Sequence, residues 1–233
     1  MGSALSAVCG AGAGLLTSPF FLLIGLPPQT AIGTAKFGGI GLTAGSFGRF
    51  RNTEHIRKEF VLPFVLISSI AAVIGMILLV HLPEHVVRIF IGGGVLVALP
   101  FLFAKDRGLE RRATTKIQRN TGWLLKLFGE SAQAAFGSGL GILTSLVVIF
   151  CFGFTALEAN ATKRIPGLAK EFCTLPFLIY FGFISYSHGI ALMIGSLIGG
   201  YTGAHLAIKK GNTFVKIVLT IVVLITGIQI LLK

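Results

Sequence analysis

The stretch Gly10-Ala-Gly-Ala-Gly-Leu-Leu-Thr-Ser18 occurs twice in this chain, the second time as Gly137-Ser-Gly-Leu-Gly-Ile-Leu-Thr-Ser145. Six of the nine positions are identical between the two copies. After one inserted residue, the same alignment continues downstream and pairs further identical residues: Gly25 with Gly153, Thr34 with Thr162 and Gly75 with Gly203. A repeat that keeps its register over this length predicts two copies of one structural unit.

The composition indicates a membrane protein. Hydrophobic residues make up 54% of the chain and charged residues only 12%, and the mean hydropathy is +0.87. A helix needs about 20 apolar residues to cross a hydrocarbon core of about 30 Å. Charge-free runs cover 1–35, 60–80, 89–104, 131–157, 172–208 and 217–232. We therefore expect an all-α, multi-pass protein of the cytoplasmic membrane. The first run lacks the basic leader of a signal peptide and is expected to be structural.

The basic residues match a membrane protein better than a nucleic-acid-binding one. The formal net charge is +12, but nucleic-acid binding needs a basic face on a soluble fold. Here the basic residues stand mainly in short loops between apolar runs, as the positive-inside bias predicts. Cys9, Cys151 and Cys173 lie in apolar runs, where thiols are typically packing residues. No paired acids, metal cluster or nucleophile with a base is visible, so we expect neither an enzyme nor a metal or cofactor site.

Each copy is expected to hold a glycine-rich segment followed by three helices. In the first copy these elements are predicted at 4–25, 28–48, 60–80 and 86–104, and in the second at 134–153, 156–176, 188–208 and 214–232. This divides the chain into a first transmembrane repeat at 1–105, a basic cytoplasmic linker at 106–130 and a second transmembrane repeat at 131–233.

The loop charges favour inverted repeats over parallel ones. The loop 49–58 holds four basic side chains, whereas the equivalent loop 177–186 holds none. An inverted arrangement places 17 of the 20 Lys and Arg on the cytoplasmic side, against 12 if every segment crosses fully and the halves are parallel. Inversion requires the glycine-rich segment of at least the second copy to be re-entrant.

The glycine-rich motifs are the first candidates for a binding site. Alternating glycines disfavour a long helix, and we expect a break near Thr17-Ser18-Pro19, with Thr and Ser capping a helix that restarts there. Two such half-helices would aim free amides and positive dipole ends at one point, which suits an anion. The alternative is that the glycines only permit close helix packing. The copies differ, because Leu146 replaces the proline in the second.

A second repeated patch, 31–36 and 159–164, contributes the remaining candidates. A cation inside a span is costly, so the aligned pair Lys36 and Arg164 either attracts an anion or snorkels to the headgroups. Its threonines either line the cavity or bond their own backbone. The candidate substrate-binding residues are Thr17, Ser18, Pro19, Thr34, Lys36, Thr144, Ser145, Thr162 and Arg164. The acidic residues near the spans are Glu59, Glu130, Glu158 and Glu171. Each is either a proton carrier or, as we expect from the Lys and Arg nearby, part of an ordinary interfacial ion pair.

Together with the stretch Gly25-Leu-Pro-Pro-Gln-Thr-Ala-Ile-Gly-Thr34, these motifs make the chain resemble the TauE/SafE family of sulfite and organosulfonate exporters over nearly its whole length. The resemblance implies movement of small sulfur-containing anions, such as sulfite or sulfonates, across the cytoplasmic membrane. We expect a secondary transporter of small anions that works by alternating access. A passive anion channel and a non-transporting membrane assembly factor are the alternatives. The expected partners are a small anionic substrate and the lipid bilayer, without nucleic acid; homo-oligomerisation and the coupling ion stay open.

Overall fold

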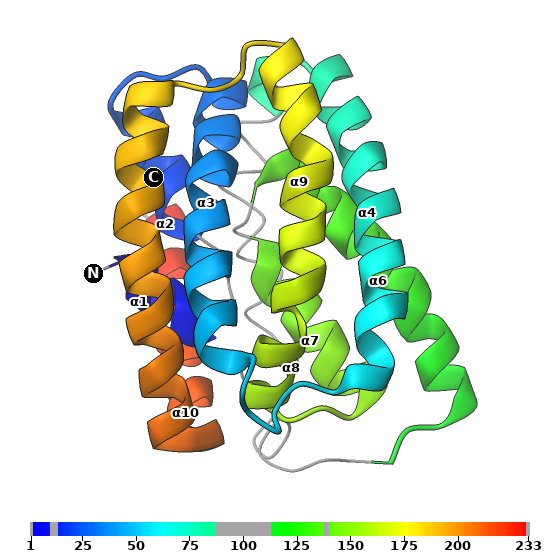
Figure 1. Cartoon of the computed structure of the whole chain (residues 1–233). Coiled ribbons are helices and arrows are strands. Elements are labelled where there is room, and N and C mark those ends of the chain that lie inside the picture. The colour runs from blue at the N-terminus through cyan, green and yellow to red at the C-terminus, as the bar shows by residue number, and fades with distance from the viewer. Residues whose placement is uncertain (1, 10–13, 87–112, 138–139, 232–233) are drawn as a thin grey trace.

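The computed structural model describes residues 2–9, 14–86, 113–137 and 140–231, and every regular element within these ranges is a helix (Figure 1). The helices are α1 (Gly2–Cys9), α2 (Gly14–Leu23), α3 (Pro28–Phe50), α4 (Lys58–His81), α6 (Lys116–Phe136), α7 (Gly141–Phe152), α8 (Ala156–Thr162), α9 (Arg164–Tyr180) and α10 (Tyr186–Leu231). Within α10, Gly211 has φ 75° and ψ −171°, which interrupts the helix. The helix predicted at 86–104 lies almost entirely outside the described residues.

The longest apolar helices lie on the outside of the molecule. By length and composition, Lys58–His81 and Tyr186–Val215 are each able to cross a membrane, and a bent pair formed by Gly141–Phe152 and Ala156–Tyr180 is a third candidate among the described residues. Leu62 and Leu66 of α4 and Ile198 of α10 are each more than half exposed. Large exposed apolar side chains on such helices are typical of surfaces that face lipid.

Glycines allow α3 and α10 to pack with their backbones in close approach. A Cβ atom added to Gly41 would lie 2.1 Å from the carbonyl oxygen of Met193, and one added to Gly45 would lie 2.1 Å from that of Leu197. The contacts progress in the same direction along both helices, so α3 and α10 are parallel, as Figure 1 shows. Small residues permit this distance between transmembrane helices.

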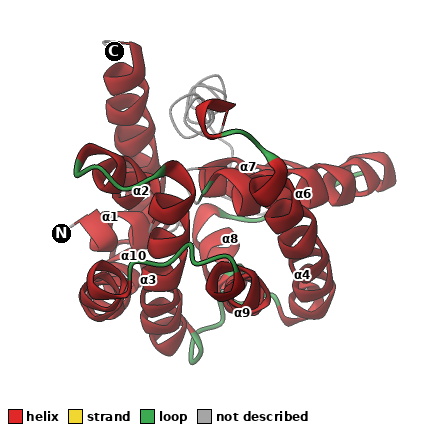
Figure 2. Ribbon diagram, turned by 90° about the horizontal axis from the view of Figure 1, so that it is seen from above, coloured by secondary structure: helices red, strands yellow, loops and turns green. Residues whose placement is uncertain are grey.

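Equivalent helices of the two copies begin at equivalent residues. In the alignment of the repeats, the first residue of α2 pairs with that of α7, the first of α3 with that of α8, and the first of α4 with that of α10. Both turns that follow α2 and α7 contain a glycine with positive φ, 90° at Gly25 and 70° at Gly153. Helices of one copy pack against helices of the other: α3 of the first copy packs against α10 of the second, and α9 of the second packs against α4 of the first. In Figures 1 and 2, α3 and α9 lie side by side, and their chain directions are opposite.

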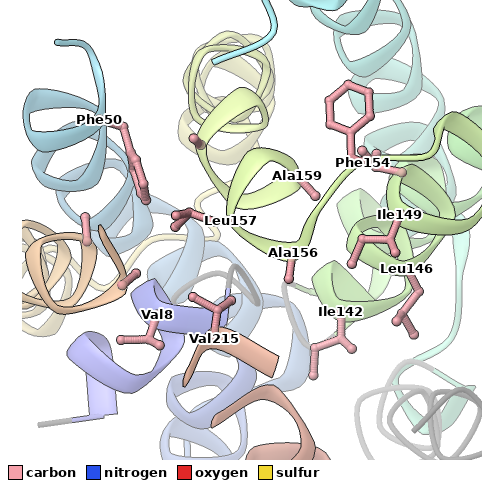
Figure 3. Packing of buried hydrophobic residues seen from close by; sticks show 14 of the residues in the cluster. Val8, Phe50, Ile142, Leu146, Ile149, Phe154, Ala156, Leu157, Ala159 and Val215 are labelled. Carbon is pink, nitrogen blue, oxygen red and sulfur yellow. The ribbon is translucent and has the colours of Figure 1, made fainter. Parts of the chain in front are cut away.

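An apolar core joins the glycine-rich region to the helices around it. Buried side chains of α1, α7, α8 and α10 form one cluster, which includes Val8, Ile142, Leu157 and Val215 (Figure 3). A ring of aromatic contacts extends this cluster to α4 and α6, where Phe64 lies 5.6 Å from Trp123 between ring centroids. Both copies therefore contribute to a single core.

Two expectations about local structure need adjustment. The predicted break near Thr17-Ser18-Pro19 is wrong, because α2 is continuous from Gly14 through Pro19 to Leu23. Proline removes only one amide donor, and neighbouring groups in a packed membrane helix can compensate for it. The region assigned to the linker includes the start of α6, where Thr115 and Gln118 form a capping box. Residues 10–13 and 138–139 of the two motifs lie outside the described residues.

Candidate functional site

The second glycine-rich motif carries an ammonium group at the start of α7. The hydroxyls of Thr144 and Ser145 donate to the carbonyl of Gly141, at 3.0 and 3.1 Å. Lys163 Nζ donates to the same carbonyl at 2.9 Å, to Thr144 Oγ1 at 2.5 Å and to Ser145 Oγ at 2.9 Å. The two hydroxyls therefore lie in the first turn of α7 and accept from a lysine, instead of capping the helix.

The first motif meets the second through Ser18. Its side chain is 2% exposed, and its hydroxyl has no hydrogen-bond partner among the described residues. A Cβ atom added to Gly137, where the second motif begins, would lie 3.5 Å from Ser18 Oγ. Thr17 and Pro19 are half-buried beside it. Because buried hydroxyls are usually hydrogen-bonded, Ser18 is a candidate contact for a ligand between the motifs.

A buried ion-pair network lies on α6 and α9. The carboxylate of Glu130, on a residue that is 2% exposed, accepts from Lys126 at 3.0 Å and from Lys170 at 2.5 Å. Lys170 also donates to Gln133 at 2.7 Å. Lys126 lies 4.4 Å from the ring centroid of Phe64. Glu130 thus forms ion pairs as expected, but within the protein interior.

Lysines outnumber carboxylates around Glu130. Lys36 is 3% exposed and makes no hydrogen bond or ion pair with another described residue, although it interacts electrostatically with Glu130 and Glu171. Lys163 also acts on the Glu130 carboxylate. Four lysine side chains, including Lys126 and Lys170, therefore surround the carboxylate of Glu130, and Lys36 also interacts with Glu171. An uncompensated charge is costly in a protein interior, and an anion bound beside these lysines would reduce that cost.

Arg164 binds protein groups at the other end of the repeated patch. Its guanidinium donates to the carbonyl of Ala7 at 2.8 Å and to the side-chain oxygen of Asn160. Asn160 in turn donates to the carbonyls of Ala7 and Val8, at 2.9 and 2.7 Å. These carbonyls belong to the last turn of α1, which lacks helical partners for them. Arg164 and Asn160 therefore cap the end of α1.

Thr34 and Thr162 have equivalent roles in the two copies. Thr34 Oγ1 accepts from the backbone amide of Ser185, just before α10, at 3.0 Å. Thr162 Oγ1 accepts from the amide of Arg57, just before α4, also at 3.0 Å. Each hydroxyl thus binds the start of a helix in the opposite copy, which differs from both expectations for these residues.

The structure brings together part of the predicted set. Thr144 and Ser145 share one lysine, Ser18 faces the neighbouring motif, and Lys36 lies in the field of Glu130. Thr34, Thr162 and Arg164 bind backbone groups. Glu158 forms the capping box of α8 with Thr155. The sequence reasoning missed Lys163 and Lys170 as site residues, and it missed Lys126 as a buried ion-pair partner of Glu130. The available signal was the position of Lys163 within the repeated patch, next to Arg164.

Apolar helices that are able to cross a membrane surround this charged interior. The family model described as "Sulfite exporter TauE/SafE" matches residues 1–230, and the chain belongs to this family of membrane transporters. It is 26% identical over 225 residues to "Probable membrane transporter protein ORF9" of Sinorhizobium sp, covering 94% of this chain and 85% of that protein.

Two further relatives have similar names. A "Probable membrane transporter protein" of Haemophilus influenzae is 27% identical over 218 residues, which covers 92% of this chain and 84% of the relative. "Probable membrane transporter protein YfcA" of Escherichia coli K12 is 21% identical over 225 residues, with coverage of 94% and 82%. No solved structure is significantly similar to the chain. Among the described residues, no group of three or more His, Cys, Asp or Glu side chains is placed to hold a metal ion.

Proposed function

We propose that this chain is a secondary transporter of small anions, which bind between the two glycine-rich motifs and are carried by alternating access of two inverted halves. The observation that carries the proposal is the excess of buried lysine around the second motif. Lys163 donates hydrogen bonds to the hydroxyls of Thr144 and Ser145. Lys163 and Lys36 both interact electrostatically with Glu130. Hydroxyl and ammonium donors in a site shielded from water are suited to binding an oxyanion.

The arrangement of the helices supports inverted halves. The helix α3 and its repeat equivalent, formed by α8 and α9, have opposite directions, since α9 runs opposite to α3 (Figure 1). The helix α4 likewise runs opposite to its equivalent, the first part of α10. The chain bends by 116° between Gly141–Phe152 and the helices that follow, which fits a re-entrant segment. In transporters with inverted repeats, the substrate site typically lies near the midplane, at the tips of discontinuous helices.

The substrate class follows from the family description and the chemistry of the site. The family is described as sulfite exporters, and sulfite and sulfonates are compact oxyanions that accept hydrogen bonds from hydroxyl and ammonium groups. The basic residues of the loops gather on one side in the inverted arrangement, which fits a protein of the cytoplasmic membrane. We therefore propose sulfite, sulfonates or related sulfur-containing anions as substrates.

Uptake of radiolabelled sulfite into proteoliposomes tests this function. The wild type is compared with Lys163→Gln, with Ser18→Ala/Ser145→Ala, and with the matched control Lys209→Gln, whose lysine is exposed on α10. We expect saturable uptake that preloaded sulfite accelerates, a loss of at least about tenfold in kcat/KM for the site variants, and no change for the control. Flux that neither saturates nor responds to preloading would indicate a channel, and no flux of any oxyanion would exclude transport of this class.

A further inference from the structure

The proposed anion site contains a carboxylate of its own. Glu130 contacts Lys170 at 2.5 Å and lies within the electrostatic field of Lys163, the lysine that binds the hydroxyls of the second motif. Its other partner, Lys126, is fully buried and lies over the ring of Phe64. Glu130 therefore interacts both with Lys126, which we regard as structural, and with Lys163 and Lys170, which belong to the proposed anion site.

This charge arrangement exists in one copy of the repeat only. The alignment that pairs the two glycine-rich motifs places Ser3 opposite Glu130, and the alignment that pairs Thr34 with Thr162 places Ala35 and Leu42 opposite Lys163 and Lys170. In contrast, the two threonines keep the same role in both copies. The Glu130 network is therefore not one of the contacts that the two copies share, and it lies at the one site where lysines accumulate.

Charge balance assigns a specific task to Glu130. When a transporter has released its substrate, the empty site must close on one side and open on the other before the next cycle of net transport. Unbalanced lysines would make that step slow, because enclosing uncompensated charge away from water is costly. A bound anion removes this cost during the loaded step. During the empty step, a carboxylate of the protein can take the place of that anion.

We propose that Glu130 is an internal counterion of Lys163 and Lys170, which the transported anion replaces and which neutralises the site when it is empty. The inference rests on the proposed function, since it needs an anion that alternates with the carboxylate. Its consequence is that Glu130 permits net transport. Without it, the protein would exchange one anion for another, because both of those steps are made with a loaded site.

The variants Lys126→Met and Lys126→Met/Glu130→Gln differ only at Glu130, so comparing them measures the effect of its carboxylate on transport. Removing Lys126 from both proteins avoids leaving that buried lysine without its ion-pair partner, which would endanger folding, while Lys170 keeps its hydrogen bond to Gln133 at 2.7 Å. Proteoliposomes loaded with radiolabelled sulfite are diluted into buffer without sulfite to measure net efflux, and into buffer with sulfite to measure exchange. We expect Lys126→Met to keep both fluxes. The double variant should lose net efflux by about 100-fold while its exchange stays within about threefold of the Lys126→Met rate.

Several outcomes would overturn the inference. A double variant with unchanged net efflux, or with net efflux and exchange reduced equally, would show that Glu130 has no separate task in the empty step. A wild type that exchanges sulfite but has no net efflux would have the same meaning. If the double variant does not fold, Glu130→Asp replaces it, and the shorter carboxylate should reduce net efflux about tenfold with exchange preserved. Equal reduction of both fluxes there would reject the proposal. Absence of any sulfite flux in the wild type would instead reject the proposed function.

Discussion

At the scale of single residues, a substitution of Thr162 tests whether this repeated polar position binds the ligand or stabilises the fold. Its hydroxyl accepts from the amide of Arg57 at 3.0 Å, so Thr162→Val leaves that amide without its partner. We expect the free energy of unfolding to fall by about 1 kcal/mol. The KM for sulfite should stay unchanged, because the hydroxyl is occupied by the backbone. Thermal unfolding in detergent and transport kinetics measure the two effects.

The conservative change Thr162→Ser provides the control. It keeps the hydroxyl and should retain most of the stability that the valine variant loses. Thr34→Val is expected to behave like Thr162→Val, since Thr34 binds the amide of Ser185 in the same way. If instead KM rises while stability is unchanged, these hydroxyls contact the anion and the assignment as helix caps is wrong.

For single residues, the sequence predicted that Lys36 is unusual, but it did not predict which side chains the buried cations contact. A lysine in an apolar run is unusual, which singled out Lys36, and its side chain is indeed buried. The link between Glu130 and Lys170 was not predictable, because these residues are far apart in the chain and meet only through the placement of α6 and α9 in space. Residues near a predicted boundary were therefore assigned to the interface, whereas the helices bury them.

At the scale of elements, Gly75 and Gly203 test whether the two copies pack by the same contact. A Cβ atom added to Gly75 would lie 2.4 Å from Ala134 Cβ, and one added to Gly203 would lie 2.8 Å from Ala7 Cβ. Ala134 and Ala7 are themselves repeat equivalents. We expect Gly75→Ala and Gly203→Ala each to lower the free energy of unfolding by about 1–3 kcal/mol, because the helices must separate.

Gly195→Ala is the matched control for this pair. It lies in the same helix as Gly203, but a Cβ atom there meets nothing within 4 Å. Alanine favours helix over glycine, so this variant should be neutral or slightly stabilising. Thermal unfolding of the purified proteins compares the three. A Gly203→Ala variant as stable as Gly195→Ala would argue against close packing of α1 on α10.

The sequence predicted helix boundaries better than it predicted the course of the glycine-rich segment. The segments predicted at 28–48 and 60–80 correspond closely to α3 and α4, because Pro28 and the charged loop give clear local signals. The glycine-rich motif contains no residue that clearly marks where a helix begins or ends. Pro19 and the preceding hydroxyls suggested a break at that point, but α2 continues through them since the flanking apolar residues still favour helix.

At the scale of the whole molecule, the direction of the halves distinguishes the two topologies. The loop after α4 begins beyond His81, and its repeat equivalent follows Lys209 in α10. Because α10 is parallel to α3, and α4 returns from α3 through a short loop, these two points lie at opposite ends of the molecule (Figure 1). Parallel repeats that cross fully would instead place them on the same side of the membrane.

This difference can be measured by labelling single cysteines that replace His85 or Lys209, both of which are exposed. They are introduced into a chain in which Cys9, Cys151 and Cys173 are replaced by alanine. We expect a membrane-impermeant thiol reagent applied from outside the cell to label position 85 and leave position 209 unlabelled until the membrane is opened, as the positive-inside bias requires for the lysines of that loop. Labelling of both positions from outside would mean parallel halves. The two glycine-rich motifs would then no longer approach one site from opposite sides, and alternating access about that site would lose its structural basis.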